Sequence, residues 1–257
     1  MKYRNVFTRL DEIENIKEAT KISSLILRSL RDAVKIGASA EDIHLLAEDE
    51  CKKYDVVPSF KGVSGPITPF PKSVCISINE EILHGLPKKT TVFKSGDIVK
   101  VDFGIVYKGF YTDHCVTVGL GDISKDEERL INTAKLCVDE AVKEAIVGNS
   151  TGDISYVLEN IASLGGFKFI TAYCGHGIGK SLHESPEILS WGERKSGTKL
   201  IEGMLLCIEN QITLGSNKLV LQSDGWTLNT QDGSKGAMFE HMVLVAKNAP
   251  IILTLLD

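Results

Sequence analysis

Two apolar stretches that each contain an aspartate constrain the fold of this chain more than any other feature. Residues 97–106 and 109–118 are rich in β-branched and aromatic side chains, which predicts two strands of an antiparallel hairpin. With Tyr107-Lys108 as a two-residue loop, counting outward along the strands pairs Asp102 with Asp113. Facing like charges destabilise a sheet, and unpaired carboxylates in apolar surroundings cost more still. A bound cation would remove this conflict; the alternative is a shifted register that leaves one aspartate in solvent.

The C-terminal half of the sequence repeats this pattern. Glu209 follows the apolar run 204–208, and Glu240 interrupts the apolar run 237–243. A single Glu in a strand usually faces solvent, but four acids in two strand pairs make coincidence a poor explanation. A fifth donor is His176, whose flanking glycines would let the backbone approach a ligand closely.

Four carboxylates and one imidazole form an oxygen-rich set of donors without thiolate. Such a set favours manganese, iron(II), cobalt(II) or zinc at a reactive centre over a structural zinc site. Four carboxylates also carry more negative charge than one divalent ion balances. We therefore expect two ions that share bridging carboxylates and activate water for hydrolysis.

Hydrophobic periodicity and capping residues predict the other elements. Helices are expected at residues 13–34, from Ser39 through 47, and at 124–147 and 151–163, and further strands at 73–78, 204–213, 225–230 and 238–245. Asp232-Gly233 is expected as a turn between the last two strands, and the proline-containing residues 56–71 as a loop. Helices followed by a carboxylate-bearing strand pair in each half predict an α+β chain with antiparallel sheet and one domain, 1–257.

Composition argues against several classes of protein. A net charge of −5 without a basic stripe disfavours nucleic-acid binding. The longest apolar run, residues 251–256, is far shorter than the roughly 20 residues of a membrane-spanning helix, and no signal-peptide pattern follows the start. The six cysteines are scattered without CxxC spacing, which indicates reduced core residues. A cytosolic protein that does not bind membranes is expected.

An ordered set of motifs resembles the type I, bacterial-type methionine aminopeptidases, a family with the pita-bread fold. The matching stretches are residues 71–80, 84–87, 96–99, 175–179, 183–186 and 239–241. His176 and Glu209 are only 33 positions apart, which leaves no room for the insertion that marks the type II branch. The resemblance implies an antiparallel sheet covered by helices, with an internal pseudo-twofold repeat.

The resemblance also implies a role for each matching residue. Two divalent ions (cobalt, manganese, iron(II), zinc or nickel) would be held by Asp102, Asp113, His176, Glu209 and Glu240. Asp113 and Glu240 would bridge the ions, and Glu209 would accept the proton of the attacking water. His84 and His183 would contact the scissile amide as catalytic and substrate-binding groups. Phe70, Cys75 and Trp226 would line the pocket for the methionine side chain.

Some positions depart from the family pattern. Around Glu209, Cys-Ile-Glu-Asn-Gln (207–211) replaces the usual Thr-Ile-Glu-Pro-Met. Phe70 replaces a pocket tyrosine, and Leu182 replaces a Phe beside the second histidine. His114 follows Asp113 in place of a small hydroxyl residue, and strand alternation predicts that it faces away from the site. These changes leave the preference for the second substrate residue open.

The resemblance implies removal of the first methionine from nascent proteins whose second residue is small. The enzyme would be a monomer that meets its substrates at the ribosome. Two alternatives remain: a related enzyme such as a proline-specific aminopeptidase, and an inactive pita-bread scaffold that binds protein or RNA. Compact length disfavours the first, and the presence of all five candidate ligands disfavours the second.

Overall fold

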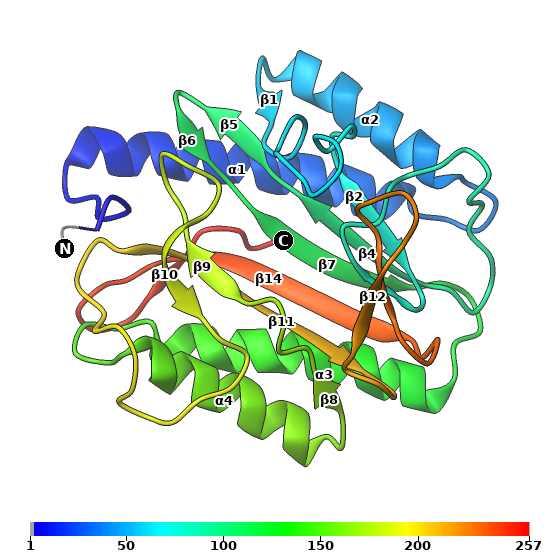
Figure 1. The fold of residues 1–257 in the computed structure, drawn as a ribbon. Coiled ribbons are helices and arrows are strands. Elements are labelled where there is room, and N and C mark those ends of the chain that lie inside the picture. The colour runs from blue at the N-terminus through cyan, green and yellow to red at the C-terminus, as the bar shows by residue number, and fades with distance from the viewer. Residues whose placement is uncertain (1–2, 257) are drawn as a thin grey trace.

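The computed structural model describes residues 3–256, which form a central antiparallel sheet flanked by four α-helices (Figure 1). The strand order is β10-β9-β11-β14-β7-β4-β2, with β15 beside β14 and β8 beside β11. The bounds are β2 Cys75–Ile78, β4 Ile98–Phe103, β7 His114–Gly119, β8 Lys168–Phe169, β9 Gly175–Gly177, β10 Glu184–Ile188, β11 Leu205–Thr213, β14 Gly236–Leu244 and β15 Ile251–Ile252. The predicted α+β class is confirmed.

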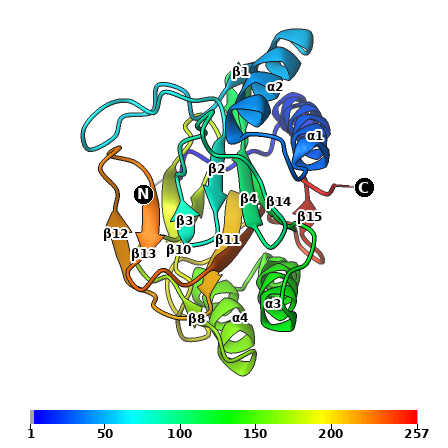
Figure 2. The same ribbon diagram turned by 90° about the vertical axis from the view of Figure 1, so that its right-hand side faces the viewer.

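Two small sheets extend the central one. One contains β1 (Val57–Pro58), β5 (Ile105–Tyr107) and β6 (Phe110–Tyr111), and the other contains β12 (Leu219–Leu221), β13 (Leu228–Thr230) and β3 (Glu81–Leu83). In Figure 2 the β3-β12-β13 sheet lies on the side of the central sheet opposite to α1 and α3. The helices therefore leave one face of the central sheet for other segments to cover.

Capping boxes begin three of the helices. The helices are α1 (Leu10–Ala33), α2 (Ala40–Lys53), α3 (Lys125–Ala141) with a following 3-10 turn (Val142–Glu144), and α4 (Thr151–Leu164). Ser39, Ser124 and Ser150 each pair with an acidic residue three positions later, which satisfies free backbone N–H groups at the helix start. Helix α3 ends six residues before the predicted 147, because the chain tightens into the 3-10 turn and Ile146 then bridges to Ala246.

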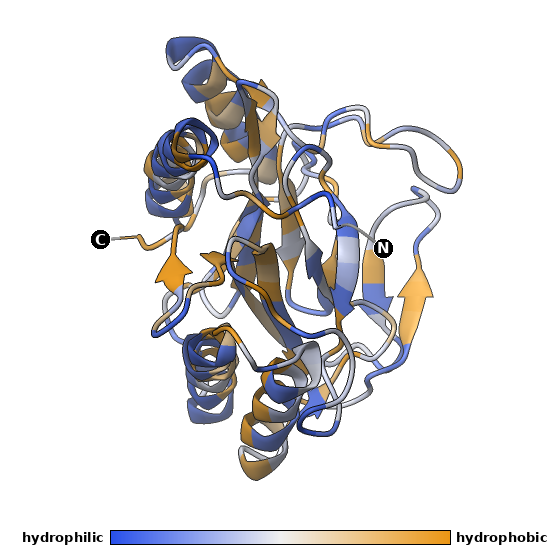
Figure 3. Ribbon diagram, turned by 90° about the vertical axis from the view of Figure 1, so that its left-hand side faces the viewer, coloured by the Kyte–Doolittle hydropathy of each residue, from blue (hydrophilic) through white to orange (hydrophobic). Residues whose placement is uncertain are grey.

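Each half of the molecule packs a helix pair onto strands of the central sheet. Helices α1 and α2 share one hydrophobic core with β2 and β4, and α3 and α4 share another with β11 and β14. Figure 3 shows that hydrophobic residues dominate the central strands, whereas hydrophilic residues occupy much of the helix surface. In each half the helix pair precedes the strands that carry the carboxylates, as the sequence predicts. Among the described helices, none is long and apolar enough to cross a membrane.

The predicted hairpin forms, but its predicted loop is wrong by one residue. The two-residue turn is Lys108-Gly109, and Tyr107 pairs with Phe110 across it. Both turn residues have positive φ (48° and 76°), as a type I′ turn requires, and glycine adopts this conformation without strain. The glycine therefore belongs inside the turn and not on the following strand.

The true register separates the two aspartates along the ladder. Asp102 pairs with Cys115, so the prediction that it directly faces Asp113 is wrong. Asp113 lies in a kink between β6 and β7, opposite the point where Gly104 separates β4 from β5. A Cβ on Gly104 would lie 1.8 Å from the Thr112 carbonyl oxygen, so the kink depends on close contact between the two backbones.

Replacing Gly104 with Ala should destabilise the protein by about 3 kcal/mol, the upper end of overpacking costs. The new methyl group must displace backbone at Thr112, next to Asp113. Gly109→Ala is the matched control, because no atom lies within 4 Å of its Cβ position and only its positive φ is strained, for about 1 kcal/mol. Urea unfolding of both variants measures the difference, and equal losses would contradict the close contact.

The last predicted strands differ in extent and pairing. Only Leu228–Thr230 of residues 225–230 is a strand, because Gly225 turns the chain with φ 80°. The Asp232-Gly233 turn is present, but the strands on either side, β13 and β14, belong to different sheets. The turn therefore connects strands of two different sheets and does not close a hairpin.

Candidate metal centre and substrate cavity

The five predicted ligands come from adjacent elements of the central sheet. Asp102 lies on β4, Asp113 precedes β7, Glu240 lies on β14, Glu209 on β11 and His176 on β9. Glu209 and Glu240 are direct cross-strand partners, so the facing pair of like charges is here and not in the N-terminal hairpin. The sheet brings all five side chains to one cavity.

Several ligand atoms lie close enough to share a cation. Carboxylate oxygens of Asp102, Asp113 and Glu240 lie within 4.8 Å of one another. His176 Nε2 is 3.9 Å from Asp113 Oδ2, and His176 Nδ1 is 2.9 Å from the Gly177 carbonyl oxygen. Because a carbonyl only accepts hydrogen bonds, Nδ1 carries the proton, and Nε2 is left with its lone pair beside the carboxylates.

The structure itself tests whether these residues fit a cation. Asp113, Glu209 and Glu240 are buried, and Asp102 Oδ1, Asp113 Oδ1 and Glu240 Oε1 are buried without a hydrogen-bond partner in residues 3–256. Buried carboxylate oxygens without partners are strongly unfavourable unless a positive charge compensates them. The donor set therefore fits divalent cations.

Burial and mutual repulsion shift the pKa values of these groups. Burial raises the pKa of Asp102 to about 7 and that of Glu209 to about 8. The pKa of Asp113 lies well above its usual range because of burial and the Glu240 charge, and the pKa of Glu240 is raised by burial and by Glu209. Burial lowers the pKa of His176 to about 3, so its imidazole is neutral and available as a ligand.

His84 and His183 both line the cavity of 430 Å³ over the carboxylates. The His183 and His176 rings lie 4.5 Å apart, and a His183 nitrogen lies within 4.8 Å of ligand atoms of His176 and Asp113. His84 has a positive φ of 56°, just after β3, and burial lowers its pKa to about 4. Both imidazoles therefore stand beside the carboxylate cluster, and that of His84 is neutral near pH 7.

A second cavity of 230 Å³ adjoins the first. The two cavities share His84, His183, Asp102 and Asp113 as lining residues. The second cavity also contains the predicted Phe70, Cys75 and Trp226, together with Phe60, Val63, Ser64 and Leu182. An apolar pocket thus opens onto the candidate metal centre.

Aromatic contacts shape this apolar pocket. The Phe70 and Trp226 rings meet edge to face at 5.0 Å, and Trp226 Nε1 donates a hydrogen bond to the Thr68 carbonyl at 3.0 Å. Gly65 permits the indole to approach, since a Cβ there would lie 2.1 Å from the ring. Phe60 and Val63 were missed because residues 56–71 show only loop composition.

Three of the positions that depart from the family pattern have clear structural surroundings. His114 faces away from the site, as predicted, with Nε2 2.9 Å from Ser23 Oγ on α1. Gln211 lies beside the site, and its amide donates to the Glu209 carboxylate. The sulfur of Cys207, which replaces the usual Thr, lies within 4.8 Å of ligand atoms of His176 and Glu240. The two-residue alternation of β11 could have revealed both, because residues 207, 209 and 211 share one face.

Comparison with known proteins identifies the family. Residues 14–247 match the sequence model of metallopeptidase family M24. The chain belongs to metallopeptidase family M24. Relatives of this M24 chain include the methionine aminopeptidase of Clostridium acetobutylicum, 41% identical over 246 residues, which cover 96% of this chain and 97% of the relative. Methionine aminopeptidase 1 of Bacillus subtilis is 35% identical over 243 residues, covering 95% of this chain and 96% of the relative.

Solved structures agree with this membership. The crystal structure of methionine aminopeptidase from Thermotoga maritima matches this M24 chain with a TM-score of 0.93 and 38% identity, over 98% of this chain and 99% of that one. X-Pro aminopeptidase from the same organism shares the fold, with a TM-score of 0.76 and 22% identity, and the match covers 63% of its chain. The predicted pita-bread fold and the predicted resemblance to methionine aminopeptidases are confirmed.

Proposed function

We propose that this chain removes the N-terminal methionine from polypeptides whose second residue is small, with two divalent metal ions at the carboxylate cluster. One observation carries the proposal: an apolar pocket with room for a thioether side chain opens directly onto the cluster of candidate ligands. His84 and His183 lie at this junction, where the bond that follows a bound methionine would be.

The ligands divide between two sites that share carboxylates. Asp102 would serve one ion, His176 and Glu209 the other, and Asp113 and Glu240 would bridge them. Cobalt, manganese, iron(II), zinc and nickel all suit this set of oxygen and imidazole donors. When bound, the ions supply Lewis acidity to a water molecule and to the scissile carbonyl.

The protein's own groups would carry out the remaining steps. Glu209, oriented by the Gln211 amide, would accept the proton of the attacking water. Neutral His84 and His183 would donate hydrogen bonds to the oxygen of the tetrahedral intermediate or a proton to the leaving amine. Phe70, Cys75 and Trp226 would hold the methionine side chain and exclude water from the reacting bond.

The biological setting is part of the same proposal. Residues 1–257 would act as one catalytic unit and as a monomer in the cytoplasm. The substrates would be nascent polypeptides, met at the ribosome as their N-termini emerge. The methionine aminopeptidase relatives, matched over nearly their whole length, support this assignment of substrate.

Peptide hydrolysis tests the proposed function. Protein stripped with a chelator should release methionine from Met-Ala-Ser only after a divalent metal is added back, and should not cleave Ala-Ala-Ser. Release from Ala-Ala-Ser would indicate a broader aminopeptidase. No release with manganese, cobalt, iron(II), zinc or nickel would indicate a scaffold without activity.

Replacing Phe70 with Ala should lower kcat/KM for Met-Ala-Ser by about 10-fold, because one aromatic wall of the methionine pocket is lost. Phe70→Tyr is the matched control, since it keeps the ring and adds the hydroxyl that the family usually has, and it should stay within about twofold. Steady-state kinetics on both variants decides the point. An unchanged Phe70→Ala enzyme would contradict the placement of the methionine side chain.

A further inference from the structure

A groove of 920 Å³ leads away from the carboxylate cluster along a different wall from the methionine pocket. It shares Ser185 and Glu187 with the central cavity, whereas the methionine pocket shares none of its lining residues with the groove. Its other walls come from Tyr3, the start of α4 and the loop 189–198. A volume of this size is typical of a binding site.

The groove runs beside an open sheet edge. Strand β10 is the first strand of the central sheet and pairs only with β9 in the part of the chain that is described. Ser185, Pro186 and Glu187 of this strand line the groove. An edge strand presents unpaired backbone groups to which an extended peptide can add, and on β10 these exclude an N–H at Pro186.

The carboxylates in the groove lack positive partners. Within residues 3–256, the groove is lined by Glu159, Glu187 and Glu193 but by no Lys or Arg. Glu159 accepts a hydrogen bond from the Gly192 amide, while no ion pair involves Glu187 or Glu193 among the described side chains. The groove is therefore negative, and two of its three carboxylates are free to meet a cation.

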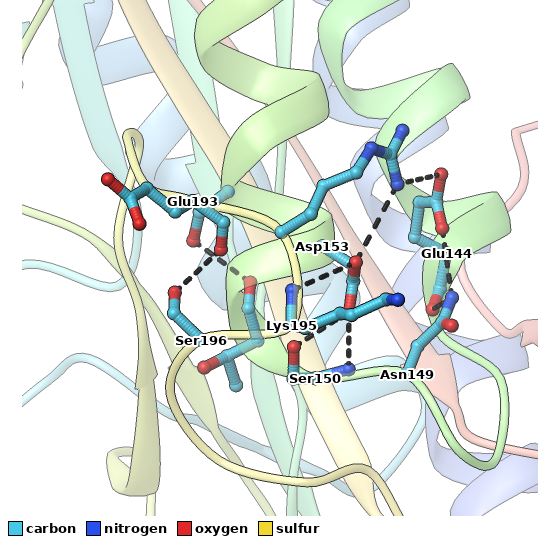
Figure 4. A network of polar contacts seen from close by, with 10 residues as sticks. Glu144, Asn149, Ser150, Asp153, Glu193, Lys195 and Ser196 are labelled. Atoms are coloured by element: carbon cyan, nitrogen blue, oxygen red, sulfur yellow. Dashed lines mark hydrogen bonds and ion pairs between the residues drawn. The ribbon is translucent and has the colours of Figure 1, made fainter.

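The Arg194 side chain beside the groove is engaged in a separate network. The Arg194 guanidinium contacts Glu144 at 3.2 Å and Asp153 at 3.7 Å, and the Lys195 amide donates to Asp153 Oδ1 at 3.2 Å. In Figure 4 the Glu193 side chain points away from the Asp153 contacts. This network fixes the loop that forms one groove wall to the start of α4 and pairs Arg194 with carboxylates outside the groove lining.

We propose that the substrate segment after the second residue lies extended along the outer edge of β10, and that basic side chains in this segment are preferred over acidic ones. The inference rests on the proposed function, because the pocket for methionine sets where the chain enters. The first side chain of the substrate fills that pocket, and its first peptide bond lies over the carboxylate cluster. The rest of the substrate must therefore continue beyond this cluster. The groove offers a continuous path with matching charge.

Three peptides of equal length test the preference. We would compare Met-Ala-Ser-Lys-Ser-Lys, Met-Ala-Ser-Gln-Ser-Gln and Met-Ala-Ser-Glu-Ser-Glu, with Met-Ala-Ser as the short reference. Two exposed charge contacts predict a kcat/KM about 10-fold higher for the lysine peptide than for the glutamate peptide at low salt. The ratio should shrink towards one at about 1 M salt, where charges are screened within about 3 Å. A ratio within twofold at low salt would overturn the proposal, whereas failure to cleave even Met-Ala-Ser would instead refute the proposed function.

A pair of double variants locates the effect. Glu187→Gln with Glu193→Gln should reduce the ratio of the lysine to the glutamate peptide to below about threefold. The control combines Glu18→Gln on α1 with Glu128→Gln on α3, two exposed carboxylates that do not line the groove, and it should keep the full ratio. An equal reduction in both double variants would show an effect of net charge alone and would overturn the groove as its origin.

Discussion

Replacing Asp113 with Asn should lower methionine release by at least about 100-fold, the upper limit for residues that only support a metal ligand. Asp113 is buried, one of its oxygens has no hydrogen-bond partner among the described residues, and it lies within reach of both Asp102 and His176. The amide keeps the volume of the side chain but loses the negative charge that the proposed cations require. Elemental analysis measures the loss of bound metal, and kcat with Met-Ala-Ser measures the loss of activity.

The control for this variant is Asp122→Asn, at an exposed turn after β7, which should change neither metal content nor activity. The same Asp113→Asn change should stabilise the protein when metal is removed, because it relieves repulsion from Glu240, Asp102 and Glu209. A variant that keeps full activity with bound metal would refute the role of Asp113.

Replacing His183 with Ala should lower kcat by about 100-fold to 1000-fold while metal stays bound, because a donor to the reacting oxygen is lost. His183 lines both the cavity over the carboxylates and the adjoining apolar pocket, and its ring lies 4.5 Å from that of His176. The comparison is His176→Ala, which should lose metal as well as activity. Loss of metal from the His183 variant would instead make His183 a ligand, since its nitrogen lies within 4.8 Å of ligand atoms of Asp113 and His176.

Local patterns predicted most of the helices and the long strands. Ser39 and Ser124 precede helices, as their capping sequences indicate. The apolar runs around Glu209 and Glu240 form β11 and β14, as predicted. The short strands β9 and β10 were missed, because glycines around His176 and a proline within β10 hide any alternation. Their existence depends on pairing with β11 and with each other.

Register was the harder problem. In the hairpin, Gly109 lies inside the turn because it adopts a positive φ without strain. Each residue of the first strand therefore pairs with a residue two positions later on the second strand than predicted. The direct pairing of Glu209 with Glu240 lies beyond local patterns, because β12 and β13 come between β11 and β14 and belong to another sheet. Direct pairing of like charges therefore occurs at Glu209 and Glu240 and not at Asp102 and Asp113, and all four carboxylates line the same cavity.

The groove beside β10 had no sequence pattern of its own. It combines Tyr3, the start of α4 and the loop after β10, which lie far apart along the chain. Each segment alone has an ordinary surface composition. Only the tertiary arrangement joins them to the cavity over the carboxylates.

Thermal unfolding with and without metal tests most directly whether the buried carboxylates form a cation site. Metal at about 100 times its Kd should stabilise the stripped protein by about 2.7 kcal/mol, and hence raise Tm by about 5–10 °C. The raised carboxyl pKa values, about 7 for Asp102 and about 8 for Glu209, favour the folded state when these groups are protonated. Their contribution to the stability of stripped protein is complete below about pH 4 and is lost as the pH rises through 7 to 8.

The measurement is therefore made at pH 5 and at pH 8 on stripped protein, with manganese or cobalt added to half of each sample. We expect the larger increase in Tm at pH 8, because protons compete less strongly with metal for the carboxylates there than at pH 5. Asp113→Asn should show a much smaller increase at that pH. No increase with either metal at either pH would contradict the account that these five residues exist to hold divalent ions.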